Sequence, residues 1–241
     1  MAKVVSVIKA DGEREIFSRE KLEQSLRRVG ATPDVVDAIV VHVEKEIMDD
    51  MSTTDIYRHA FNLLREKQKH VAVRYSLRRA LAGLGPTGFP FESYISEIFK
   101  ARGFAVETDR IVQGACVPHE VDVVAYNEQK LIMAEVKFHN EYGYKSDLKV
   151  ALYVKARMDD LMKSSFLYGG KHRKLDEGWL VTNTKFSQTA IDYGKCVGMT
   201  MLGWNYPEKG SLEQLIEEYR LHPLSCLSSL GTTHKQALFK R

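Results

Sequence analysis

Apolar residues dominate two short stretches in the middle of the chain. The stretches 121–126 and 131–138 are rich in β-branched, aliphatic and aromatic residues, and they flank the turn-forming segment 127–130. Two such runs around a polar turn predict a β-hairpin. If Tyr126 pairs with Leu131, the register of every other pair in the hairpin follows.

Three charged residues interrupt this hairpin. In the register just given, Asp122 stands directly opposite Glu135, and Lys137 lies on the same face as Glu135, one step further along. Like charges about 4.5–5.5 Å apart on opposed strands are destabilising, so we expect a cation between them. Two carboxylates suit Mg²⁺, which prefers oxygen ligands. A structural salt bridge from Lys137 to either acid also fits the spacing.

Helix-like and strand-like spacings alternate through the rest of the second half. The predicted elements are a helix over 91–102, strand segments over 104–106 and from 113 onward, the hairpin, a helix over 146–162, a strand over 179–183, a helix over 188–196 and a strand over 199–206. This order predicts an α/β layered fold, and strands that are apolar on both faces imply helices on both sides of the sheet. The polar, glycine-containing tract 168–174 predicts a mobile loop.

The first half has a different pattern, with a small β-ribbon followed by helices. Strands over 3–9 and 14–17 flank Asp11-Gly12, a strong hairpin signal. Start and stop residues predict four helices after the ribbon, over 19–29, from 33, from 53 and over 71–81.

Glycine and proline cluster at 83–88, between the two differently patterned halves, and we predict a domain boundary there. The expected organisation is a small helical lobe over 1–84, an α/β domain over 88–210 and a helical tail over 211–241, so the fold class is α/β overall. The tail begins with an amphipathic helix over 211–219, and the sequence after it suits a partial helix-turn-helix pairing.

Composition and charge narrow the class of protein. The chain has no apolar run near the roughly 18–20 residues that span a bilayer, and its start lacks a secretory signal, so we expect a cytoplasmic protein with no membrane partner. Between positions 145 and 174, eight Lys or Arg face three Asp, a local charge of +5. Such a stretch suits a nucleic-acid phosphate backbone, and it equally suits a solvated helix face. The candidate DNA-binding residues in it are Lys145, Lys149, Lys155, Lys171, Arg173 and Lys174.

The first lobe resembles an ATP cone. The segments that carry the resemblance are Val7–Gly12, Glu15–Phe17, Glu20–Leu22, Thr53–Ile56 and Val71–Tyr75. ATP cones bind ATP or dATP without hydrolysis and regulate ribonucleotide reductases and their repressor. The resemblance spans nearly all of residues 3–84 and implies an adenine-nucleotide site, although ordinary surface lysines also fit the pattern. The residues that it places in the site are Val7, Lys9, Glu15, Lys21 and Thr53.

The second half resembles the Mrr-like branch of the PD-(D/E)xK restriction-endonuclease superfamily, over roughly residues 88–206. The resemblance is carried by Phe91–Tyr94, Asp122, Glu135–Lys137 and Val181–Phe186. Those enzymes use Mg²⁺ to hydrolyse DNA phosphodiesters. It implies that Asp122 and Glu135 bind Mg²⁺ or Mn²⁺, that Lys137 serves the attacking water, and that Glu92 is an accessory ligand. A solvent-facing helix glutamate is the alternative for Glu92.

Together the two resemblances imply a Mg²⁺-dependent DNA endonuclease that responds to an adenine nucleotide. We expect ATP or dATP to bias the arrangement of domains, or of subunits in a homo-oligomer. A nucleotide-sensing DNA-binding regulator with an inactive nuclease fold is the main alternative, and an assembly module without DNA contact is a third. The intact set of Asp122, Glu135 and Lys137 favours the enzyme, because a retired site tends to lose charges that are costly to keep.

Overall fold

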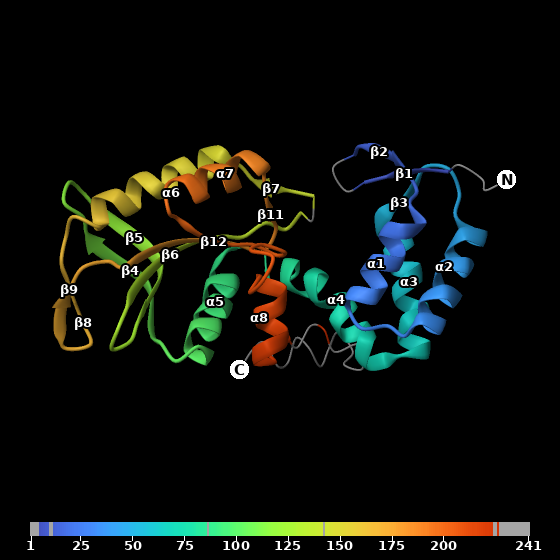
Figure 1. Cartoon of the computed structure of the whole chain (residues 1–241), viewed down its shortest axis with the longest axis horizontal. Coiled ribbons are helices and arrows are strands. Elements are labelled where there is room, and N and C mark those ends of the chain that lie inside the picture. The colour runs from blue at the N-terminus through green and yellow to red at the C-terminus, as the bar shows by residue number, and fades with distance from the viewer. Residues whose placement is uncertain (1–4, 10–11, 86, 142, 224–225, 227–241) are drawn as a thin grey trace. The chain divides into compact units, whose positions relative to one another are not determined.

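The structure is a computed structural model that describes residues 5–9, 12–85, 87–141, 143–223 and 226 (Figure 1). Its described residues fall into two compact units. The cone unit comprises those of segments 1–80, 141–143 and 223–241, and the sheet unit comprises those of 81–140 and 144–222. The domain boundaries predicted at 84 and 88 remain a prediction.

The cone unit combines a small sheet with four helices. Its three strands, β1, β2 and β3, form a sheet in the order β2-β1-β3, with β2 antiparallel and β3 parallel to β1. The elements are β1 (Ser6–Ile8), β2 (Arg14–Ile16), α1 (Arg19–Arg28), α2 (Pro33–Glu46), β3 (Met51–Ser52), α3 (Thr53–Lys67) and α4 (Lys69–Ala82), whose last residues belong to the sheet unit. The short strand β3 was missed because two residues carry no readable alternation.

Local sequence explains where the helices of the cone unit begin. The Ser18 side chain accepts a hydrogen bond from the backbone N–H of Lys21, and the Ser52 side chain accepts one from Asp55. Each serine thereby satisfies a free N–H group in the first turn, as an N-cap does. The helices enclose an apolar core whose most buried members include Leu26, Val36, Ile39, Val40, Ala60 and Leu64.

The sheet unit has a five-stranded sheet in the order β12-β10-β6-β5-β4. The strands β6, β10 and β12 run parallel, and β5 is antiparallel to both β4 and β6. The elements are α5 (Phe89–Ala101), β4 (Ala105–Gln113), β5 (Pro118–Tyr126), β6 (Leu131–Lys137), β7 (Lys145–Ser146), α6 (Leu148–Leu161), β8 (Phe166–Tyr168), β9 (Lys171–Arg173), β10 (Glu177–Thr182), β11 (Lys185–Phe186), α7 (Gln188–Cys196), β12 (Thr200–Leu202) and α8 (Leu212–Tyr219).

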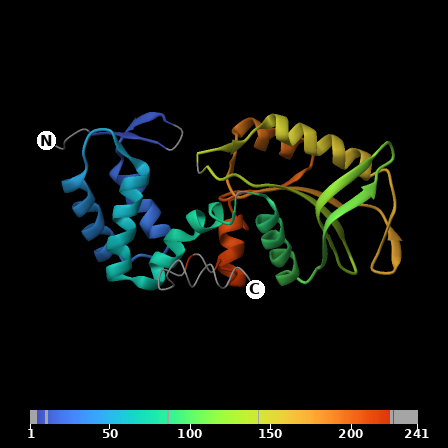
Figure 2. The same ribbon diagram turned by 180° about the vertical axis from the view of Figure 1, so that it is seen from behind.

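Helices cover both faces of this sheet. In the views of Figures 1 and 2, α6 and α7 lie on one face, and α5 and α8 lie on the other. The residues of β6 from Leu131 to Val136 are all buried, as expected for a strand with helices on both sides. The predicted α/β class, with a small cone lobe before a sheet-containing core, is confirmed.

The hairpin register agrees with the predicted one. Tyr126 pairs with Leu131, and the ladder continues through Ala125 and Ile132 to Val123 and Ala134. Asn127 closes the turn, because its side-chain oxygen accepts hydrogen bonds from the backbone of both Gln129 and Lys130, each at 2.9 Å.

Two sequence predictions about the sheet unit were wrong. The tract 168–174 is not a loop, because β8 and β9 form a hairpin around Gly169 and Gly170, whose positive φ angles of 61° and 75° suit a tight two-residue turn. Strand segments were predicted over 104–106 and from 113 onward, whereas β4 runs without a break from Ala105 to Gln113, and its polar, exposed residues concealed the middle of it.

Two further predictions concern the helices and the tail. Among the described residues, every helix is too short or too polar to cross a membrane. The helix-turn-helix pairing predicted for the tail falls mostly on residues outside the described ones.

Candidate functional site

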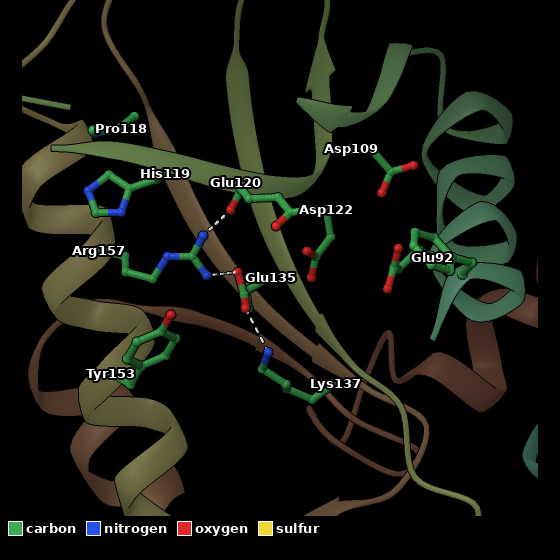
Figure 3. A pocket seen from close by; sticks show the side chains of 11 residues that line it. Glu92, Asp109, Pro118, His119, Glu120, Asp122, Glu135, Lys137, Tyr153 and Arg157 are labelled. Carbon is green, nitrogen blue, oxygen red and sulfur yellow. Dashed lines mark hydrogen bonds and ion pairs between the residues drawn. The ribbon is translucent and has the colours of Figure 1, made fainter. Parts of the chain in front are cut away.

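A polar pocket of about 390 Å³ opens where β5 and β6 diverge in the sheet unit (Figure 3). Side chains reach it from β4, β5 and β6 and from the flanking helices α5 and α6. Its lining residues are Phe89, Glu92, Asp109, Pro118, His119, Glu120, Asp122, Glu135, Lys137, Tyr153 and Arg157. Four of the predicted site residues, Glu92, Asp122, Glu135 and Lys137, therefore share one pocket.

The position of Asp122 follows from the end of the hairpin ladder. The ladder between β5 and β6 ends at Val123 and Ala134, and two residues further along β6 the N–H of Val136 donates to the Asp122 carboxylate at 2.6 Å. The side chain thus replaces a backbone acceptor and is held against the neighbouring strand. Burial, and then the charge of Glu135, raise the pKa of Asp122 to about 6, against the opposing effects of the Val136 N–H, Lys137 and Arg157.

Glu135 carries two cationic partners. Its side chain is 5% exposed, and one carboxylate oxygen lies 2.7 Å from Lys137 Nζ while the other pairs with Arg157 Nη1. Arg157 also donates to the backbone carbonyl of Glu120 (Figure 3). A buried carboxylate needs such partners, because an unpaired charge in this environment costs several kcal/mol.

Arg157 was missed as a site residue by the sequence analysis. It was counted only as part of the basic stretch, because no spacing relates α6 to the hairpin before the fold is known. Arg157 stands one turn beyond Tyr153 on α6, and its guanidinium lies 5.4 Å from the Tyr153 ring centroid, a contact that is visible only in the folded structure.

Asp109 was also missed, and its backbone explains why. Thr108 pairs with Val123 and Arg110 with Val121 in one unshifted register, so Asp109 stands opposite Asp122. These two residues do not pair, and Asp109 has a φ of 53°. Left-handed φ is uncommon for a non-glycine residue, and such conformations cluster at active sites. Figure 3 shows its carboxylate turned toward those of Asp122 and Glu92. A single residue with an unusual backbone conformation has no signature in an alternation pattern.

Glu92 reaches the pocket from the first turn of α5. Burial, and then the charges of Asp122 and Asp109, raise its pKa to about 7, and a hydrogen bond with Asp109 adds to the shift. Near neutral pH, therefore, this side chain is poised between its charged and uncharged forms. Glu92 therefore faces the pocket, and the alternative of a solvent-facing helix glutamate does not apply.

His119 has a structural role at the edge of the pocket. Its Nε2 lies 2.9 Å from an Asp160 carboxylate oxygen, and Asp160 also accepts hydrogen bonds from the backbone N–H groups of Cys116 and Val117. The hydrogen bond with His119 is the main cause that lowers the pKa of Asp160. These contacts fix the turn between β4 and β5 to α6.

The six predicted DNA-binding residues lie outside the described lining of the pocket. Lys155 pairs with Asp159, and the side chains of Lys171 and Arg173 donate to the backbone carbonyls of Glu128 and Asn127, at 2.9 and 2.7 Å. Figure 1 places β7, with Lys145, and β9 at opposite ends of the sheet unit. The six residues therefore do not form one continuous patch.

In the cone unit, the predicted nucleotide-site residues gather around the end of β1. Glu15 lies between two lysines, with 2.9 Å to Lys21 Nζ and 3.3 Å to Lys9 Nζ. The hydrogen bond from Lys21 is the main cause that lowers the pKa of Glu15. Val7 is buried in β1, and Thr53 is the first residue of α3, directly after the strand β3 that pairs with β1.

Comparison with known families identifies the first lobe. Residues 5–83 match the family model of the ATP cone domain. The expected resemblance of the first lobe is therefore confirmed, and an N-terminal ATP cone suggests regulation by nucleotide binding.

A sequence comparison and a structure comparison each find a match of unassigned function. An uncharacterized protein of Archaeoglobus fulgidus is 41% identical over 133 residues, which cover 55% of this chain and 71% of that protein. This match is longer than the ATP cone segment, so it extends into the second part of the chain. A crystal structure of a protein of unknown function, AF1548, is 35% identical, with a TM-score of 0.52 over 64% of this chain and 78% of that one.

Two other solved structures are much more distant. Can2 from Sulfobacillus thermosulfidooxidans in complex with cyclic tetra-adenylate is 11% identical, with a TM-score of 0.37 over 83% of this chain and 54% of that chain. The MspJI restriction endonuclease in complex with an oligonucleotide is 12% identical, with a TM-score of 0.35 over 86% of this chain and 43% of that chain. Similarity this low carries no argument about the sheet unit, and the Mrr-like assignment remains a prediction.

Proposed function

This chain belongs to the same family as the uncharacterized Archaeoglobus fulgidus protein. From the residues of its own pocket, we propose that it is a Mg²⁺-dependent DNA endonuclease, regulated by ATP or dATP that binds at the ATP cone. The observation that carries the proposal is the convergence of Asp122, Glu135 and Lys137 in one pocket where two strands diverge. The cytoplasmic location expected from the sequence stays part of the proposal.

The donor set fits a hard divalent cation. The carboxylates of Glu92, Asp109, Asp122 and Glu135 supply oxygen ligands only. Burial, and then repulsion from neighbouring acids, raise the pKa values of Glu92 and Asp122. Both Glu135 oxygens are already paired, but a carboxylate has about four acceptor positions, so each oxygen can accept a further partner. Asp122 and Glu135 would hold Mg²⁺ or Mn²⁺, with Glu92 as an accessory ligand. Such an ion polarises a phosphoryl oxygen and lowers the pKa of a bound water.

Three other residues of the pocket have roles in the proposed reaction. Lys137 positions the attacking water and offsets the negative charge that develops on the phosphoryl oxygens. Arg157 fixes the orientation of Glu135 and compensates its charge after burial. Asp109, in its left-handed backbone conformation, adds a further carboxylate to the pocket, which favours a bound cation over an anion.

DNA would contact exposed basic residues of the sheet unit. Lys145, Lys149 and Lys174 are exposed and suit contacts with the phosphate backbone. Lys155, Lys171 and Arg173 already have protein partners, so their contribution to DNA binding requires them to exchange or share those contacts.

Regulation would begin at the lysine pair of the cone unit. The phosphates of ATP or dATP would replace Glu15 as the partner of Lys9 and Lys21, close to the N-terminus of α3, where free N–H groups favour anions. The nucleotide can act on the nuclease only if it binds one domain or subunit arrangement better than another, and a homo-oligomer would offer such arrangements.

A plasmid assay tests this function. Purified protein with Mg²⁺, with and without ATP or dATP, is expected to nick or linearise DNA. The Asp122→Ala and Lys137→Ala variants should lose cleavage but retain DNA binding, whereas Asp192→Ala, which removes an exposed carboxylate on α7, should cleave like wild type. Equal cleavage by all four proteins would place the chemistry elsewhere. DNA retention without cleavage under any divalent cation would favour the nucleotide-sensing regulator.

A further inference from the structure

A cluster of two histidines and one glutamate joins two helices of the cone unit. His42 and Glu46 stand four residues apart on α2, so their side chains share a face of that helix. His59 reaches the same point from α3. In Figures 1 and 2, α2 and α3 lie side by side in the cone unit. The family match and the nuclease proposal leave these three residues unexplained.

The distances within the cluster are those of metal ligands. His42 Nε2 lies 3.1 Å from one Glu46 carboxylate oxygen, and His59 Nε2 lies 3.2 Å from the other. One ligand atom from each of the three residues lies within 4.8 Å of the other two. Two ligands about 2.0–2.1 Å from a tetrahedral ion are roughly 3.3 Å from each other, so an ion fits with little movement.

The orientation of the two rings is also suitable. The imidazoles of His42 and His59 are 5.1 Å apart between centroids and inclined by 45°, so both can direct a nitrogen toward a shared point beside Glu46. The three side chains are 44%, 50% and 33% exposed, in the order His42, Glu46, His59. That exposure gives an ion access from solvent and leaves room for a water as the fourth ligand.

We propose that His42, Glu46 and His59 form a site for a first-row transition-metal dication, with Zn²⁺ as the representative ion. Imidazole nitrogens select such ions over Mg²⁺ and Ca²⁺, which prefer oxygen donors. The site therefore differs in chemistry from the carboxylate pocket of the sheet unit. A bound ion links α2 to α3, the helix that begins at the predicted nucleotide contact Thr53. Metal occupancy thus stabilises the cone unit in the conformation that holds both helices together.

Zinc titration of the full chain by calorimetry tests the proposal. Wild type is expected to bind one Zn²⁺. The His42→Ala and His59→Ala variants should bind it at least about tenfold more weakly, since the loss of a residue that only supports a metal ligand already lowers metal affinity by roughly 10–100-fold. His70→Ala is the matched control, because His70 is an exposed histidine on α4 of the same unit. Asp122→Ala should retain this binding event, which separates it from any zinc held by the carboxylate pocket.

Two further measurements keep the test independent of folding defects in the variants. In wild type, Zn²⁺ should shift the imidazole nitrogen resonances of His42 and His59 among the eight histidines of the chain, and should leave those of His70 unchanged. Saturating Zn²⁺ should also raise the thermal midpoint by at least about 4 °C, because it binds the folded state alone. Unchanged His42 and His59 resonances, or identical zinc binding by wild type and the two alanine variants, would overturn the proposal.

Discussion

The carboxylate pocket of the sheet unit and the lysine pair of the cone unit shift the pKa values of their acidic residues in opposite directions. In the pocket, Glu92 and Asp122 lie among other acids, and their pKa values rise to about 7 and about 6. In the cone unit, Glu15 lies between Lys9 and Lys21, and its pKa falls. The pocket has an excess of negative charge that a cation would neutralise, whereas in the cone cluster Lys9 and Lys21 are paired with Glu13 and Glu15, whose place the phosphates of a nucleotide would take. The contrast assigns a different ligand to each unit.

Cleavage activity should show the largest effect. Asp122→Ala removes one of the two proposed metal ligands in the pocket. We expect the rate of Mg²⁺-dependent DNA cleavage to fall by at least about 10³-fold, which is within the range for loss of a positioned charge or general base. Initial rates on supercoiled plasmid measure it. In the cone unit, Glu15→Gln should leave nucleotide-free cleavage near the wild-type rate. Similar losses for both variants would mean that the two acids do not have different functions.

Stability should separate the two regions next. Glu135→Gln leaves Arg157 and Lys137 without their charged partner, and because the Arg157 side chain is only 12% exposed, we expect unfolding free energy to fall by about 3 kcal/mol. Glu15→Gln breaks pairs with Lys21 and Lys9 that are more exposed, at 66% and 34%, and should cost less than about 1 kcal/mol. Urea unfolding followed by circular dichroism gives both values. Equal costs would show that burial does not distinguish the two clusters.

The pH dependence of stability should have opposite signs in the two regions. The pKa of Asp122 in the folded protein is about 6, above its ordinary 3.8, so the folded state binds the proton more tightly and stability falls as the pH rises from about 4 to about 6. Glu92 extends this fall to about pH 7. Glu15, with its lowered pKa, instead contributes stability that is lost as the pH falls.

Urea unfolding at pH 5 and pH 8 without metal measures how much the pocket contributes to the pH dependence of stability. Wild type should lose about 1 kcal/mol more than Asp122→Asn between these pH values, after a discount for solvent screening, and Mg²⁺ should restore most of the difference at pH 8. Parallel pH profiles for wild type and Asp122→Asn would show that the carboxylates do not repel each other as described.

The smallest expected effect is on nucleotide affinity. Removing one phosphate-binding charge by Lys21→Ala should weaken ATP binding by about tenfold, the equivalent of about 1.4 kcal/mol. Lys67→Ala, an exposed lysine on α3, is the matched control. Calorimetric titration with ATP and dATP measures both. Equal affinities for Lys21→Ala and Lys67→Ala would remove Lys21 from the nucleotide site.

The hairpin shows what could be predicted from the sequence. Its register is local, because the turn at Asn127 and the pairing of Tyr126 with Leu131 fix all later pairs, and the structure agrees as far as Val123 and Ala134. Beyond that pair the strands diverge, and the Asp122 side chain takes the Val136 N–H. The prediction that the two acids approach each other therefore rested on a sound register, while the divergence that forms the pocket was not foreseen.

The residues that were missed depend on long-range structure. Arg157 meets Glu135 only because α6 crosses the strand ends, 22 residues later in the chain. Asp109 reaches the pocket from the position on β4 that stands opposite Asp122, where the pairing of β4 with β5 is interrupted. Neither a helix crossing nor an interrupted pair leaves a periodic trace in sequence, so such residues become visible only when the elements are assembled. The ATP cone was recognised because its signature is a set of short local motifs.

The central claim, that Asp122 and Glu135 share a divalent cation, can be tested directly. Crystals of the protein grown or soaked with Mn²⁺ allow an anomalous difference map at the manganese edge. We predict one peak in the pocket, coordinated by a carboxylate oxygen from each of Asp122 and Glu135. If crystals that contain Mn²⁺ gave a map with no peak in contact with both carboxylates, that result would contradict the account.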